Sequence, residues 1–73
     1  MSIPVSTIGS ITSGEEAGQF LEVLPDADEP GGFVLQFYRH GDRSEPCGDL
    51  LADDLDDAVA IIDAWDLTVE WPA

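Results

Sequence analysis

The chain has 73 residues, 44% of them hydrophobic, and its sixteen Asp and Glu face two Arg and no Lys, for a formal net charge of −14. So many apolar residues exclude a disordered acidic tail, and the length allows one modest core, so we expect one domain over residues 1–73. The charge disfavours nucleic acid and anionic membranes as partners, because both are bound through basic patches, and favours a basic protein.

Two strands are predicted at the start of the chain. Six of the ten residues 3–12 are β-branched and none is charged, which predicts a strand with Pro4 near its start and Gly9 as a bulge or break. Residues 13–18 form a turn with Gly at both ends, and a second strand follows at residues 20–24.

A third strand follows an acidic loop. Residues 25–32 contain two Pro and two Gly, which exclude regular structure. Residues 33–39 alternate as a strand should, with three large apolar side chains on one face: Phe33, Leu35 and Phe37. Residues 40–48 are polar, with Gly and Pro at intervals, and are predicted to be a connection.

The last part of the chain predicts one helix and one strand. Five apolar residues share one arc of a helical wheel and are expected in the core: Leu55, Ala58, Val59, Ile62 and Trp65. Asp53 is the predicted N-cap with Asp56 as a weak capping-box partner, and Asp49 is the alternative cap. After Asp66 the period changes to two, which predicts a strand at residues 67–71. The order β-β-β-α-β favours an α+β fold, a small antiparallel sheet with one helix packed across it.

A cytoplasmic location is expected. Cys47 is the only cysteine, so no disulfide can form within the chain, which fits a reducing compartment. The first residues lack the basic and apolar segments of a signal peptide, and no apolar run approaches the roughly 18 residues that span a bilayer.

Two motifs suggest chemistry without completing a site. The loop Arg39-His40-Gly41-Asp42-Arg43-Ser44-Glu45-Pro46 resembles the signature of histidine phosphatases, in which the His accepts the phosphoryl group and arginines hold the phosphate. Here the Pro comes one residue late, and the chain has no second His and no further Arg, so we expect neither catalysis nor a cofactor.

Metal-binding patterns are also incomplete. Asp26, Asp28 and Gly31 match the start of an EF-hand loop, but Phe37 stands where the bidentate Glu is required. One Cys and one His are too few for a zinc site. We therefore expect no dedicated metal site.

The carboxylates are the remaining candidates for function. Acids in the first helical turn interact favourably with the helix dipole and need no functional explanation, whereas Asp63 and Asp66, near the helix C-terminus, carry charge where it costs stability. Acid retained at such a cost suggests a binding surface. The predicted partner-binding residues are Asp56, Asp57, Asp63, Asp66, Glu70, Glu22, Asp28 and Glu29.

The chain resembles, in type, the small acidic immunity proteins with which bacteria neutralise their own toxins. The resemblance lies in its size, its acidity, the run Asp53-Asp54-Leu55-Asp56-Asp57-Ala58 and the closing Val69-Glu70-Trp71. It implies a non-enzymatic inhibitor that occludes the basic surface of a toxin such as a nuclease. Two alternatives remain open: an acidic nucleic-acid mimic of phage origin (anti-restriction or anti-CRISPR), and a housekeeping protein-interaction domain.

Overall fold

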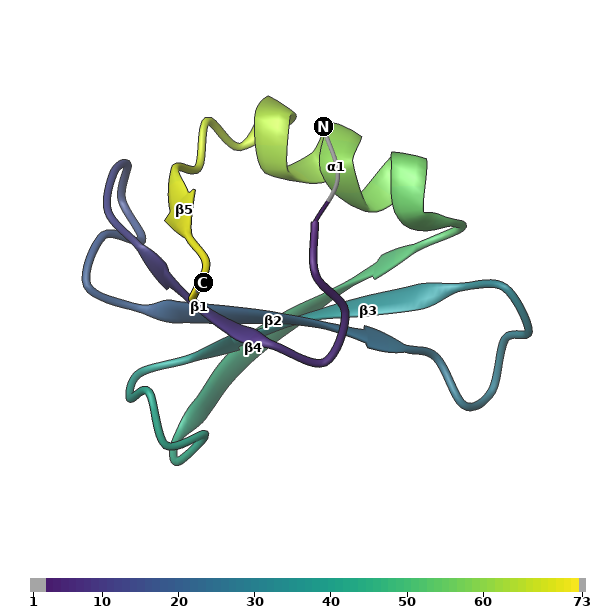
Figure 1. The fold of residues 1–73 in the computed structure, drawn as a ribbon, viewed down its shortest axis with the longest axis horizontal. Helices are drawn as coiled ribbons and strands as arrows, with labels where there is room; N and C mark the ends of the chain where they lie inside the picture. Colours follow the sequence, from purple (N-terminus) through teal and green to yellow (C-terminus); the bar gives the residue numbers. More distant parts are fainter. Residues whose placement is uncertain (1–2, 73) are drawn as a thin grey trace.

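In the computed structural model, which describes residues 3–72, a five-stranded antiparallel sheet carries one helix across one face (Figure 1). The elements are β1 (Ile8–Ile11), β2 (Phe20–Pro25), β3 (Phe33–Tyr38), β4 (Pro46–Ala52), α1 (Leu55–Ala64) and β5 (Val69–Glu70). The strand order is β4-β3-β2-β1-β5, so β4 and β5 form the two edges. The predicted α+β class, with a small antiparallel sheet and one helix, is confirmed.

The core lies between α1 and the sheet face beneath it. Leu21 and Val23 of β2 and Leu35 of β3 are completely buried, and Ala58 and Ile62 cover them from the helix. These strand residues belong to the apolar half of each alternating pattern, which therefore selects the face that α1 covers.

The first strand is shorter than the predicted 3–12. Ser6 has a left-handed φ of 58°, and its N–H donates to the Val23 carbonyl at 2.7 Å, so the chain turns before β1 begins. Ile3 is still buried, but it reaches the core from outside the sheet. Gly9 pairs with Leu21 in unbroken register, so the predicted bulge or break there is wrong.

Strand β4 was not predicted. The sequence predicts a connection over its first residues and Asp49 as an alternative helix cap, yet all seven residues from Pro46 to Ala52 form an edge strand beside β3. Phe37 pairs with Gly48 and Tyr38 with Pro46, which leaves Cys47 as the extra residue of a bulge. The element order is therefore β-β-β-β-α-β.

The helix begins one residue later than predicted. Asp54 is the N-cap, and its carboxylate accepts from the Asp57 N–H at 2.7 Å, while the Asp57 carboxylate accepts from the Asp53 N–H at 2.9 Å. The first half of the predicted capping box is present with its two residues moved on by one, but the Asp57 carboxylate accepts from the residue before the N-cap instead of from the N-cap itself. The helix ends at Ala64, so Trp65 becomes its C-cap and is 46% exposed instead of buried.

Candidate functional site

Carboxylates dominate the surface that the structure presents. Of the sixteen Asp and Glu, only Glu22 and Glu45 have an ion-pair partner among residues 3–72, which leaves fourteen without one. All fourteen are exposed or half-exposed. The structure therefore concentrates unneutralised negative charge at its surface.

Glu22 is the exception. The sequence predicts that it binds a partner, but the structure buries it. The residue is 3% exposed on β2. Arg43 donates to its two carboxylate oxygens at 2.9 and 2.7 Å, and the Tyr38 hydroxyl lies 3.3 Å from one of them. The hydrogen bonds from Arg43 lower the pKa of Glu22 despite its burial, and burial raises the pKa of Tyr38. Glu22 holds the β3–β4 loop to the sheet and is not available to a partner.

One group of carboxylates surrounds a concave surface beside the edge of β4. We call it the acidic hollow; it has a volume of about 600 Å³ and is lined by Asp26, Asp28, Glu29, Val34, Asp49, Leu51, Ala52 and Asp53. Leu51 is 70% exposed within it. Five carboxylates therefore enclose an apolar side chain that points into solvent.

Local hydrogen bonds shape the rim of this hollow. The Asp26 side chain accepts from the Asp28 N–H at 2.9 Å, and the Asp26 N–H donates to the Gly32 carbonyl at 3.0 Å. These bonds close the β2–β3 loop on itself. They fix the backbone that carries Asp28 and Glu29, both of which were predicted to bind a partner.

The other predicted residues lie elsewhere. Asp56 and Asp57 are in the first turn of α1, near Asp53, while Asp63 and Asp66 are at its far end. Asp57 and Asp63, the nearest members of the two groups, are six residues apart, which is a rise of roughly 9 Å along the helix. Glu70 is on β5, at the sheet edge opposite β4. The structure thus brings together Asp28 and Glu29 with the unpredicted Asp26, Asp49 and Asp53, and does not gather all eight predicted residues.

Asp26, Asp49 and Asp53 were missed because the prediction lacked β4. Residues 49–52, Asp-Leu-Leu-Ala, do not alternate between polar and apolar types, so the sequence carries no period-two signal for that strand. With β4 paired to β3, Leu51 lies opposite Val34, and the carboxylates of neighbouring loops converge around both.

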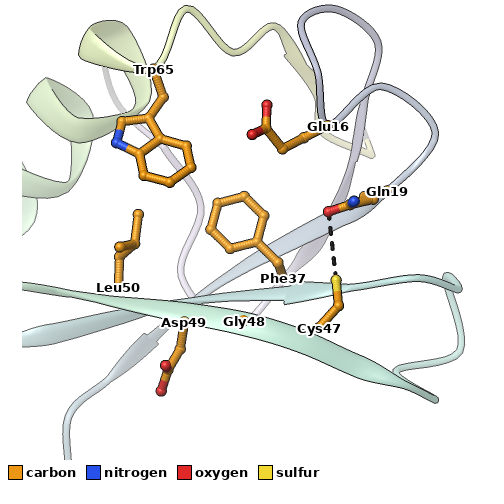
Figure 2. A pocket seen from close by; sticks show the side chains of 8 residues that line it. All are labelled: Glu16, Gln19, Phe37, Cys47, Gly48, Asp49, Leu50 and Trp65. Atoms are coloured by element: carbon orange, nitrogen blue, oxygen red, sulfur yellow. Dashed lines mark hydrogen bonds between the residues drawn. The ribbon is translucent and has the colours of Figure 1, made fainter.

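A second concave surface lies on the helix side of β4, as Figure 2 shows. We call it the Trp65 hollow; it has a volume of about 250 Å³, and the side chains that face it include Trp65, Phe37, Leu50, Glu16 and Gln19. The rings of Phe37 and Trp65 are stacked, with centroids 6.2 Å apart. Asp49 points away from this hollow, toward the other face of the sheet (Figure 2).

Cys47 borders the Trp65 hollow as an exposed free thiol, with Sγ 3.5 Å from the Gln19 side-chain oxygen. The hydrogen-bond partner of the thiol is thus an amide oxygen, and Arg39, His40 and Arg43 are paired with carboxylates instead.

The phosphatase-like loop uses its basic residues internally. Arg43 is bound to Glu22, while Arg39 and His40 lie 3.9 and 3.8 Å from the exposed Glu45 carboxylate. Both arginines therefore already have carboxylate partners. Among residues 3–72, no group of three or more His, Cys, Asp or Glu is arranged to hold a metal ion, and no helix is long and apolar enough to cross a membrane.

Comparison of the chain with models of protein families, with curated proteins and with solved structures finds no match.

Proposed function

We propose that this chain is a non-enzymatic binding protein that neutralises a basic protein by covering its positively charged surface, as an immunity protein does. One observation carries the proposal: fourteen exposed or half-exposed carboxylates have no ion-pair partner among residues 3–72. Mutual repulsion among them opposes the compact state, and a cationic partner would relieve that repulsion on binding.

The same charge distribution favours fast association. Opposite potentials steer two proteins together and can raise association rates well above the about 10⁵–10⁶ M⁻¹s⁻¹ of uncharged pairs. Basic surfaces that bind nucleic acid carry the required Lys and Arg. A toxin that acts on nucleic acid is therefore the class of partner that we favour.

The test begins with the immobilised chain and a lysate of the source organism. We expect it to retain a basic protein, to abolish the activity of that protein at equimolar ratio, and to associate more slowly as salt increases. A captured protein that stays fully active, or an association rate that does not change with salt, would refute neutralisation by charge.

Matched variants locate the contact. Asp28→Asn with Glu29→Gln removes two charges at the acidic hollow, and Asp63→Asn with Asp66→Asn removes two at the far end of α1. The second pair should also stabilise the free chain by about a few tenths of a kcal/mol, because it removes charge that opposes the helix dipole. The pair that slows association more identifies the binding end; if neither pair slows it, these carboxylates are not the contact.

A further inference from the structure

We infer that the outer edge of β4 accepts an extended segment of the basic partner as a sixth strand, with Lys or Arg side chains over the acidic hollow and an apolar side chain in the Trp65 hollow. The inference rests on the proposed function, because it specifies how the partner is held.

The first support is the free edge. Strand β4 is the longest strand and lies at the end of the sheet. Every second residue of an edge strand points its N–H and C=O away from the sheet, where they can pair with another strand. Among residues 3–72, no backbone hydrogen bond from outside the sheet reaches residues 49–52.

The second support is that only one end of β4 is protected against pairing with another strand. Proline and bulges are common devices that prevent unwanted strand pairing. Pro46 and the bulge at Cys47 interrupt only the first part of β4. Residues 49–52 pair with β3 in unbroken register from Gln36 back to Phe33, so this half keeps the regular geometry that another strand can extend.

The third support is the difference between the two faces. Asp49 and Leu51 belong to the acidic hollow, whereas Leu50 packs against the core beside the Trp65 hollow. Side chains of an added strand would alternate between these faces. The segment that fits therefore alternates basic and apolar residues. Its backbone hydrogen bonds to β4 provide affinity, and the two hollows provide specificity for its side chains.

The size of the Trp65 hollow favours a side chain as its occupant. Its volume of about 250 Å³ is below the about 300–1,000 Å³ typical of small-molecule sites. Stacked Phe37 and Trp65 provide an apolar wall for it.

Charge excludes the most obvious competitor, a second copy of this chain. Pairing two β4 edges would bring together two chains of formal net charge −14 and two acidic hollows. That repulsion opposes self-association at this edge. A basic segment is instead attracted to the negative charge of the acidic hollow.

Synthetic peptides test the inference directly. The probes are an eight-residue peptide that alternates Lys and Val, a peptide of the same composition with four Lys followed by four Val, and alternating peptides N-methylated on every Val or on every Lys. Binding to the full chain is measured by titration at low salt, and backbone amide shifts are followed by NMR.

We expect the alternating peptide to bind about tenfold more tightly than the block peptide and to shift the amides of residues 49–52 and the indole N–H of Trp65. One of the two methylated forms should lose binding, because it lacks the N–H groups that face β4. Equal binding by all four peptides would overturn strand addition while leaving charge-driven binding intact. If none of the peptides binds, strand addition at β4 is also overturned. The proposed function has its own test and fails if no basic protein is captured and inhibited.

Two variants provide a matched check. Leu51→Lys and Ala60→Lys each add one positive charge at an exposed position, the first in the acidic hollow and the second on α1. Leu51→Lys should weaken the alternating peptide by about tenfold and Ala60→Lys by less than about twofold. An equal loss of peptide affinity in the two variants would show that the peptide does not bind at the acidic hollow. The NMR shifts locate the bound peptide without any substitution.

Discussion

Gly9 lies in β1 where the side chains of Trp71 and Val69 come closest to the strand. A Cβ at this position would lie 2.6 Å from a ring carbon of Trp71 and 2.6 Å from a methyl carbon of Val69. Both contacts are shorter than real Cβ atoms show, so Gly is required for close approach and not for a special backbone angle.

Gly9→Ala should therefore destabilise the fold by about 1–3 kcal/mol, the usual cost of forcing an extra carbon into a packed site. The free energy of unfolding, measured in urea, checks this value. Ser10→Ala, in the same strand, is the control and should have little effect. Unchanged stability of the Gly9 variant would mean that Trp71 does not pack over β1.

Glu22 gives the fold a defined dependence on acid. Its pKa is lowered from the ordinary value of 4.5, first by the hydrogen bonds from Arg43. A carboxyl group whose pKa is lower in the folded than in the unfolded state stabilises the fold above the unfolded value. This contribution disappears as the pH falls through the lower, folded pKa.

Glu22→Gln should cost about 1.5–3 kcal/mol at neutral pH, the range for hydrogen bonds to a charged group. The difference from the unmodified chain should stay constant above pH 4.5 and shrink below it. Denaturant unfolding across this pH range measures both. Glu45→Gln, at an exposed ion pair, is the control and should show neither effect; a loss for Glu22→Gln that does not vary with pH would argue against the charged pair.

At the scale of elements, α1 depends on its first turn. Asp54 accepts from the Asp57 N–H, which would otherwise lack a partner within the helix. Asp54→Ala should cost about 1 kcal/mol of stability. Asp53→Ala removes a neighbouring carboxylate that makes no such bond and should cost less. If thermal unfolding ranks the two variants in the opposite order, the cap is at Asp53, as the sequence alone had suggested.

The pattern of β4 explains why the sequence predicted the helix better than this strand. Its first four residues, Pro46, Cys47, Gly48 and Asp49, include three types that strands disfavour. Pairing with β3 supplies what local preference lacks, and such pairing is not visible in a single stretch of sequence. The helix has its own periodicity and N-cap, so its position was predicted, although it begins one residue later than predicted and ends before Trp65.

Trp65 shows a related limit. Its position on the apolar arc was assigned correctly, but burial also depends on where the helix ends relative to the sheet. Because α1 stops at Ala64, the indole stacks on Phe37 and remains 46% exposed. The sequence predicts which side chains share the apolar face of the helix. It does not predict which of them lie beyond the part of the sheet that could bury them.

At the scale of the whole molecule, charge should make stability depend on salt. A formal net charge of −14 over 73 residues opposes folding, and added salt screens this repulsion. We expect the melting temperature to rise between 10 and 500 mM NaCl. The double variant Asp63→Asn/Asp66→Asn, with formal charge reduced from −14 to −12, should show a smaller rise. A melting temperature that falls with salt would mean that attractive pairs outweigh the repulsion.

The candidate site was only partly predictable for the same long-range reason. Composition identified carboxylates as the surface feature, but three-dimensional arrangement decides which of them act together. Asp28 and Glu29 meet Asp49 only because β4 pairs with β3 beside their loop. In the sequence, nothing distinguishes Glu22 from other strand carboxylates, because its partner Arg43 lies 21 residues away and only the fold brings the two together.

The internal use of Arg43 has a consequence for proteolysis. Trypsin cleaves after Lys and Arg, so Arg39 and Arg43 are its only targets in the chain, and both lie between β3 and β4. The Arg43 side chain must leave Glu22 before a protease can accept it, so cleavage there reports how often this loop opens. A single nick would separate the piece carrying β1, β2 and β3 from the piece carrying β4, α1 and β5, joined from then on only by the sheet and the core.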